Sequence, residues 1–127
     1  MPIQRLNPDT IYHLKGLSAT VKVGNTVHIS GQVALDGNMN TVGEGDPEAQ
    51  LRQIYSNLDK ACRAHAGTLA NMVKTITYIT DINQYPAVCK AREEAYGDVP
   101  PANSTVIVAG LARPEWLIEI EGIAYIE

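Results

Sequence analysis

Several signatures that assign a chain to a broad class are missing from these 127 residues. No stretch reaches the ~20 apolar residues of a membrane span, and the first ten residues, MPIQRLNPDT, lack the apolar core of a signal peptide. Lysine and arginine form no run and the net charge is −4, whereas a nucleic-acid surface needs clustered basic residues. Two cysteines, Cys62 and Cys89, are too few for a disulfide scaffold. We therefore expect a soluble, cytoplasmic protein with reduced thiols, no membrane association and no nucleic-acid partner.

The histidines also exclude a class of site. His13, His28 and His65 have no ligand-like spacing with one another or with the cysteines, so the sequence predicts no metal site. With 45% hydrophobic residues, the chain has enough apolar material for one compact domain over residues 1–127.

The clearest secondary-structure signal is a helix that begins at Asp46. Asp46 is a favourable N-cap, Pro47 suits the first helical position and Glu48 adds an acid to the first turn. Apolar residues then recur at spacings of three and four up to Gly67: Leu51, Ile54, Tyr55, Leu58, Ala61, Cys62 and His65. A second helix is predicted from an Asn83 cap to Gly97.

Strands are predicted where β-branched residues gather. Residues 19–23 and 26–30 form a hairpin around the turn pair Gly24-Asn25, and residues 72–80 form a central strand. Residues 1–16 are predicted to be irregular.

The C-terminal stretch holds two further strands, 104–109 and 116–126, which we expect to pair as a hairpin. Glu119 and Glu121 are two residues apart on the second strand, so both carboxylates point to the same sheet face. In such a hairpin Asn103 lies near that acidic face. On pattern alone, two acids on one strand face are more often solvated than catalytic.

These elements predict an α+β fold, a mixed and mainly antiparallel sheet of about six strands with two helices on one face. Two helices cover only one face of such a sheet. The other face keeps apolar residues that need burial, which self-association around a symmetry axis would provide.

The C-terminal stretch resembles the signature of the Rid family, the YjgF-like reactive-intermediate deaminases. That signature is a Pro-Ala-Arg-Ser run, an apolar strand, a Leu-containing turn and an Ile-Glu-Ile-Glu strand. The matching residues are Pro101, Ala102, Ser104, Leu111 and Ile118 to Glu121. The resemblance implies a chorismate-mutase-like fold and a homotrimer that binds a small molecule in clefts between its subunits, without a cofactor.

The resemblance also implies roles for individual residues. Glu119 matches the group that positions or activates the hydrolytic water, and Ser30 matches a pocket residue of the early strand. Asn103 stands where the family has the arginine that binds the substrate carboxylate, which implies substrates without a carboxylate at that position. The resemblance places four more residues in the substrate-binding set. Three of them replace a family residue: Leu17 stands in place of a tyrosine, Cys89 in place of an asparagine and Thr105 in place of a frequent cysteine. The fourth is Tyr85.

Three functions remain open at this point. The first is a cofactor-free hydrolytic deaminase of small imines or enamines, which the retained Glu119 favours. The second is a non-catalytic trimer that binds a metabolite, which the replacements at Leu17, Cys89 and Asn103 favour. The third is the ribonuclease activity sometimes attached to the family, which the net negative charge disfavours.

Overall fold

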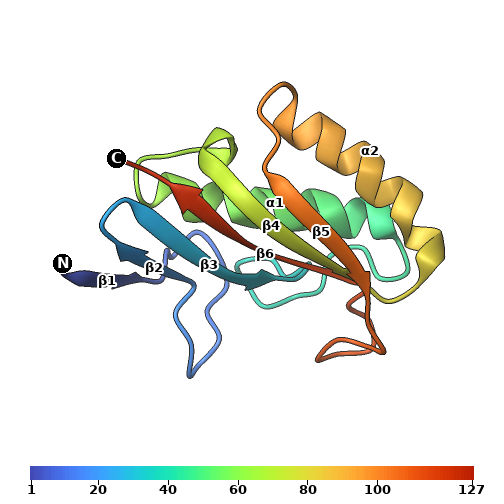
Figure 1. Cartoon of the computed structure of the whole chain (residues 1–127). Coiled ribbons are helices and arrows are strands. Elements are labelled where there is room, and N and C mark those ends of the chain that lie inside the picture. The colour runs from blue at the N-terminus through green and yellow to red at the C-terminus, as the bar shows by residue number, and fades with distance from the viewer.

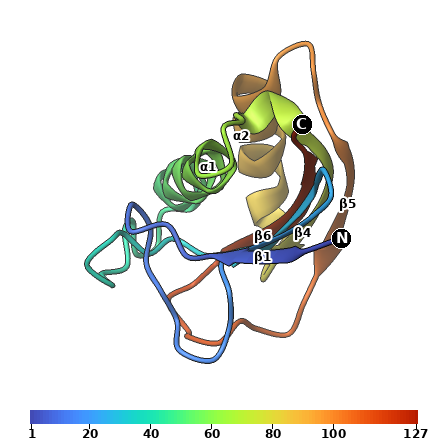
Figure 2. The same ribbon diagram turned by 90° about the vertical axis from the view of Figure 1, so that its left-hand side faces the viewer.

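The computed structural model describes all 127 residues and arranges them as a six-stranded sheet with two helices against one face (Figures 1 and 2). The strands are β1 (Ile3–Leu6), β2 (Thr20–Val23), β3 (Thr26–Gln32), β4 (Met72–Ile79), β5 (Ala102–Ile107) and β6 (Ile118–Tyr125). The helices are α1 (Pro47–Arg63) and α2 (Tyr85–Tyr96). A short 3-10 turn, η1 (Leu69–Asn71), follows α1, and a second, η2 (Ile82–Gln84), precedes α2. The predicted α+β class and the two helices on one face are confirmed.

The predicted C-terminal hairpin is wrong. The strand order is β1-β2-β3-β6-β4-β5, so β4 lies between β5 and β6. β6 runs antiparallel to both β3 and β4, whereas β5 is parallel to β4 at the sheet edge. The physical reason is the connection between β4 and β5. Helix α2 returns the chain to the end of the sheet at which β4 begins, so that β5 can pair with β4 in the same direction.

The N-terminal segment also differs from the prediction. Residues 3–6, predicted to be irregular, form the edge strand β1, which pairs antiparallel with β2. Four mostly exposed residues carry little apolar alternation, and their strand conformation comes from pairing with β2.

The helix starts follow from capping groups. The carboxylate of Asp46 accepts a hydrogen bond from the Ala49 N–H at 3.2 Å, as predicted, and Pro47 opens α1. Asn83 is not the cap of the second helix. Asp81 caps the η2 turn in a capping box with Gln84, and α2 continues from Tyr85.

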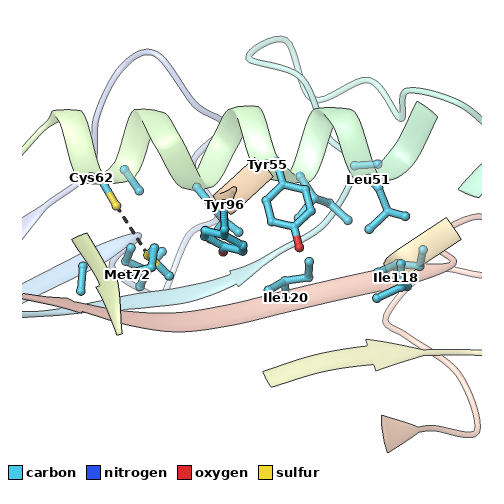
Figure 3. Close-up of a cluster of buried hydrophobic side chains, with 14 of the residues drawn as sticks. Leu51, Tyr55, Cys62, Met72, Tyr96, Ile118 and Ile120 are labelled. Atoms are coloured by element: carbon cyan, nitrogen blue, oxygen red, sulfur yellow. Dashed lines mark hydrogen bonds between the residues drawn. The ribbon is translucent and has the colours of Figure 1, made fainter. Parts of the chain in front are cut away.

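The main core lies between the two helices and the sheet (Figure 3). It contains 17 buried residues, among them Leu51 and Leu58 of α1 and Ile118 and Ile120 of β6. The rings of Tyr55 and Tyr96 meet edge to face, with centroids 5.6 Å apart, and join α1 to α2. No helix of the structure is both long and apolar enough to cross a membrane.

The opposite face of the sheet has no helix over it (Figure 2). Alternation and register place on this open face five aliphatic residues, Val21, Val23, Ile76, Val106 and Ile123, together with Thr26, His28, Lys74, Tyr78, Ser104, Glu119 and Glu121. The open face therefore mixes apolar side chains with charged and polar ones, two carboxylates among them.

Candidate functional site

Strand register divides the predicted site residues into two groups on opposite faces of the sheet. Asn103 is paired with Thr75 and Thr105 with Thr77, two buried residues on the helix side. Glu119 is paired with Tyr78 on the open face. The prediction that Asn103 lies near the acidic face is therefore wrong, because it depended on the hairpin that β4 separates.

The first group lines a cavity of about 410 Å³ at the β5 edge, which we call the edge cavity. Its walls come from β4, η2, α2 and β5, and the lining residues are Ile79, Ile82, Tyr85, Arg92, Asn103, Thr105 and Ile107. Four of the seven residues are apolar, and Arg92 is the one charged residue. This mixture of apolar walls with a few polar groups is typical of small-molecule sites. Of the predicted substrate-binding residues, Tyr85, Asn103 and Thr105 are brought together here.

Asn103 is fully engaged with its neighbours. Its side-chain NH₂ donates to the Thr75 hydroxyl at 2.8 Å and to the Thr77 hydroxyl at 3.1 Å. Its carbonyl oxygen accepts from Arg92 Nη1 at 3.0 Å and from the Thr105 hydroxyl at 2.9 Å. A guanidinium only donates, so the amide oxygen must face Arg92 and the NH₂ must face the threonines. Both amide hydrogens are used within the chain, which leaves Asn103 as a support for Arg92 and not as a donor to a ligand.

Arg92 is the site residue that the sequence analysis missed. Its half-buried side chain places a positive charge beside the position where the family arginine is replaced by Asn103. A signal was available: Tyr85, Cys89 and Arg92 are separated by four and then three residues, which puts them on one face of α2. Cys89 itself does not line the edge cavity, and its sulfur lies 3.6 Å from Arg92 Nη2.

The second group surrounds Glu119 on the open face. Burial raises the pKa of this half-buried carboxyl, and the negative charge of nearby Glu121 raises it further. Glu121 accepts a short hydrogen bond from the Tyr78 hydroxyl, which raises the pKa of that phenol. The two acids thus differ: Glu121 is held by Tyr78, whereas the structure gives Glu119 no hydrogen-bond donor within the chain.

The chain beside Glu119 leaves room for its carboxyl group. Gly31 lies directly under that group, since a Cβ atom there would collide with Glu119 Oε2. Ser30 precedes Gly31, and its hydroxyl donates to the Ser18 carbonyl at 2.6 Å. Leu17, next to Ser18, is 45% exposed and carries no polar group. Strand alternation from buried Ile29 puts Ser30 on the Glu119 side of the sheet, and neither Ser30 nor Leu17 lines the edge cavity.

A metal ion has no evident set of ligands in this arrangement. No group of three or more His, Cys, Asp or Glu side chains is suitably placed to hold one. The chemistry that the two groups offer is therefore that of a carboxyl group with a raised pKa, hydroxyls and one guanidinium.

Solved structures share this architecture. RidA from an Antarctic bacterium, Psychrobacter sp., superposes with a TM-score of 0.90 over 97% of this chain and 99% of its own, at 34% sequence identity. The YjgF gene product of E. coli superposes with a TM-score of 0.87 over 96% and 98% of the two chains, at 27% identity. The protein is thus an α+β protein with the YjgF/RidA fold, as predicted.

Sequence comparison gives the family. A family model described as Endoribonuclease L-PSP matches residues 8–126. A RutC family protein of Sulfurisphaera tokodaii is 33% identical over 103 residues, which cover 81% of this chain and 82% of the relative. A 2-iminobutanoate/2-iminopropanoate deaminase of Dermatophagoides farinae is 33% identical over 110 residues, 87% of this chain and 85% of the relative. The chain belongs to the Rid (YjgF, L-PSP) family, and the resemblance found in its sequence is confirmed.

Proposed function

We propose that this protein hydrolyses small imines or enamines to the corresponding carbonyl compound and ammonia, without a metal or cofactor. Two kinds of observation support the proposal. A relative that is 33% identical over 87% of the chain is named as a 2-imino acid deaminase. The structure also holds a carboxyl group suited to proton transfer, and this group, Glu119, is the observation that carries the proposal.

Glu119 has the properties of a general base. Its pKa is raised by burial and by Glu121, which brings the pKa closer to neutral pH and makes its carboxylate a stronger base. It has no donor within the chain to neutralise it, and Gly31 leaves the space beside it clear of a side chain. A water molecule bound to this carboxylate would be the nucleophile.

The reaction balances with water as the only co-reactant. Glu119 takes one proton from the water as its oxygen forms a bond to the imine carbon, and the C=N electron pair moves to nitrogen, which is protonated. The proton that Glu119 took from water passes to nitrogen in this first step, which restores the carboxylate. The resulting carbinolamine then breaks its C–N bond: Glu119 takes the hydroxyl proton and transfers it to the amino group, C=O forms and ammonia leaves. An enamine enters the same sequence after protonation at carbon to give the imine. Orientation and one general base supply a rate increase of about 10²–10⁴.

We further propose that the active cleft lies between subunits of a homotrimer. Within one protomer the edge cavity and Glu119 are on opposite faces of the sheet, so one small ligand does not reach both. If the open face of one protomer, with its aliphatic side chains, packs against the β5 edge of the next, the edge cavity meets the Glu119 group of its neighbour. Closed three-fold symmetry then gives three equivalent clefts, each with Ser30 and Leu17 on one wall and Asn103, Thr105 and Tyr85 on the other. We also propose a cytoplasmic location, where the two free cysteines would stay reduced.

A non-catalytic metabolite-binding trimer is the second candidate. The observation that favours it is the loss of polar groups at Leu17 and Cys89, which leaves fewer donors around a reacting centre. The ribonuclease activity named in the family description has less support in this chain. Its net charge is −4, and the surface around Glu119 and Glu121 would repel phosphates.

The test is ammonia release from freshly generated imines, half with a carboxylate and half without. We expect turnover by the wild type and a loss of about 10²–10⁴ in kcat/KM in Glu119→Gln. Glu44→Gln, which removes the same charge from an exposed loop, should match the wild type. Unchanged turnover in Glu119→Gln would refute the role of Glu119. Absence of turnover with any imine, in a protein that still binds an imine analogue, would support the metabolite-binding candidate.

A further inference from the structure

Arg92 is a half-buried cation without a counter-ion. The ion pairs of the structure join Arg63 to Asp59, Lys90 to Glu48 and Arg113 to Glu115, and none includes Arg92. Of its five N–H groups, one donates to Asn103 and one approaches the Cys89 sulfur. Three donors and the charge itself remain unsatisfied by the chain. Withdrawing a cation from water without a partner carries a cost, which a bound anion would offset.

The surroundings of Arg92 indicate what kind of anion fits. It is the only charged residue of the edge cavity, so the cavity suits a ligand with a single negative charge. The guanidinium fork matches a flat carboxylate with two parallel hydrogen bonds. Ile79, Ile82, Tyr85 and Ile107 make the remaining wall apolar, and about 410 Å³ holds only a small molecule.

The position of the guanidinium is fixed by the sheet. Asn103 accepts from Arg92 Nη1 while its own NH₂ group is bound to Thr75 and Thr77, two residues of the central strand β4. Thr105 occupies the second acceptor site of the Asn103 oxygen. A guanidinium held in this way loses less side-chain freedom when a ligand binds, which strengthens binding.

We propose that Arg92, positioned by Asn103, is the anion-binding residue of this protein and that its ligands are small monocarboxylates with a short apolar side chain. The inference rests on the proposed function for the identity of the cleft, and it names the substrate class of that cleft. It replaces the expectation of carboxylate-free substrates, which assumed that no cation stands at the Asn103 position. The charge is present, but it comes from α2 and not from β5.

Equilibrium binding tests this inference independently of catalysis. The probes are 2-oxobutanoate, a stable four-carbon monocarboxylate, and its neutral analogue 2-oxobutanamide, titrated at pH 7 by calorimetry. We expect the wild type to bind the anion about 10- to 100-fold more tightly than the amide, as for a charge-assisted bidentate contact. Arg92→Gln should lose this preference, and Arg92→Lys, which keeps the charge without the fork, should fall between the two.

Lys90→Gln is the matched control. It removes the same charge from the same helix, but Lys90 does not line the edge cavity and faces Glu48. This variant should keep the wild-type preference for the anion. Thermal unfolding of each variant shows whether Arg92 also stabilises the fold, a role that would not by itself alter the anion-to-amide ratio.

The outcomes separate this inference from the proposed function. Equal binding of the two probes by the wild type, binding of neither, or an unchanged preference in Arg92→Gln would each overturn the role of Arg92. Imine turnover can still be present in those cases. Conversely, anion binding that depends on Arg92 supports the inference even if no imine is hydrolysed.

Discussion

Glu119 and Asn103 lie on opposite faces of one sheet, although the strands that carry them both flank β4. Glu119 pairs across from Tyr78 on the open face, whereas Asn103 pairs beside Thr75 on the helix face. The carboxyl group that we propose as the base and the edge cavity of the same protomer therefore lie on opposite sides of the sheet. A function that uses both needs two protomers, and this requirement follows from strand register alone.

The first prediction concerns the pH dependence of turnover. Glu119 acts as a base only when ionised, so kcat/KM should rise with pH through its pKa. The charge of Glu121 raises that pKa, and Glu121→Gln should therefore lower it and move the acidic limb of the profile to lower pH. The pH profile of kcat/KM for the two proteins measures this shift. A limb that stays in place, or moves to higher pH, would show that Glu119 is not the titrating base.

The second prediction concerns the space beside Glu119. A Cβ atom at Gly31 would collide with the Glu119 carboxyl, so Gly31→Ala should displace this group and lower kcat by up to about 10²-fold. Gly37→Ala is the control, because nothing lies within 4 Å of a Cβ atom at that position. Steady-state kinetics of both variants, with folding checked by circular dichroism, decides the point. Wild-type kcat in Gly31→Ala would contradict the placement of Glu119 at the reacting centre.

The third prediction concerns stability and pH. His65 is buried, and its Nε2 lies 2.8 Å from the Thr20 hydroxyl, which itself donates to the Leu6 carbonyl. Burial, together with the charge of Lys22, lowers the pKa of His65 below its ordinary value of 6.5. As the pH falls through 6.5, His65 takes up a proton in the unfolded chain but not in the folded chain. The free energy of unfolding should therefore fall as the pH drops from about 7.5 to about 5.5.

Urea unfolding at a series of pH values isolates the contribution of His65. His65→Gln, whose amide still donates to Thr20, should show a smaller fall in stability than the wild type over this range. His13→Gln, at an exposed position outside the sheet, should show the same fall as the wild type. A comparison of variants is needed because Glu119, whose pKa is raised in the folded state, contributes with the opposite sign. An identical slope in His65→Gln would contradict the assignment.

The fourth prediction concerns the two thiols. Burial raises the pKa of Cys62 to about 12, and its sulfur lies 3.5 Å from that of Met72 in the core (Figure 3). The thiolate is the reactive form, so a thiol reagent at about pH 8 should modify half-buried Cys89 in the native protein and leave Cys62 intact. Cys89→Ser should then show no native-state modification. Peptide mapping that finds Cys62 modified in the folded protein would contradict the packing of the core.

The sequence predicted the elements whose signals are local. The start of α1 follows from Asp46 and Pro47, both of which lie at the helix terminus in the roles assigned to them. The pairing of Glu119 and Glu121 on one face follows from the two-residue period of a strand and agrees with the register of β6. The family motifs in the C-terminal stretch supplied the fold.

Strand order was not available from local signals. β5 and β6 are consecutive strands, and consecutive strands are usually neighbours in a sheet, which favours a hairpin. The sheet instead inserts β4 between them, because β6 pairs on both sides and β5 returns through α2. This single non-local fact separates Asn103 from Glu119, and no pattern within residues 100–126 contains it.

Arg92 illustrates a different kind of omission. Its helical spacing from Cys89 and Tyr85 was visible in the sequence. The motif of the family directs attention to the residue at the Asn103 position, and a charge supplied by another element falls outside that motif. Only the hydrogen bond between Arg92 and Asn103 shows that the cation is present at the same place.

Subunit mixing tests the central claim that each cleft combines Glu119 of one protomer with the edge cavity of another. Glu119→Gln and Arg92→Gln chains, each deficient alone toward a carboxylate imine, are co-expressed with different tags and the hybrids are purified. A cleft that receives Glu119 from one chain and Arg92 from the other is intact, and each hybrid trimer contains one such cleft among its three, so the purified hybrids should regain about a third of wild-type activity. Hybrids no more active than the two parent variants would contradict the shared cleft and show that each protomer acts alone.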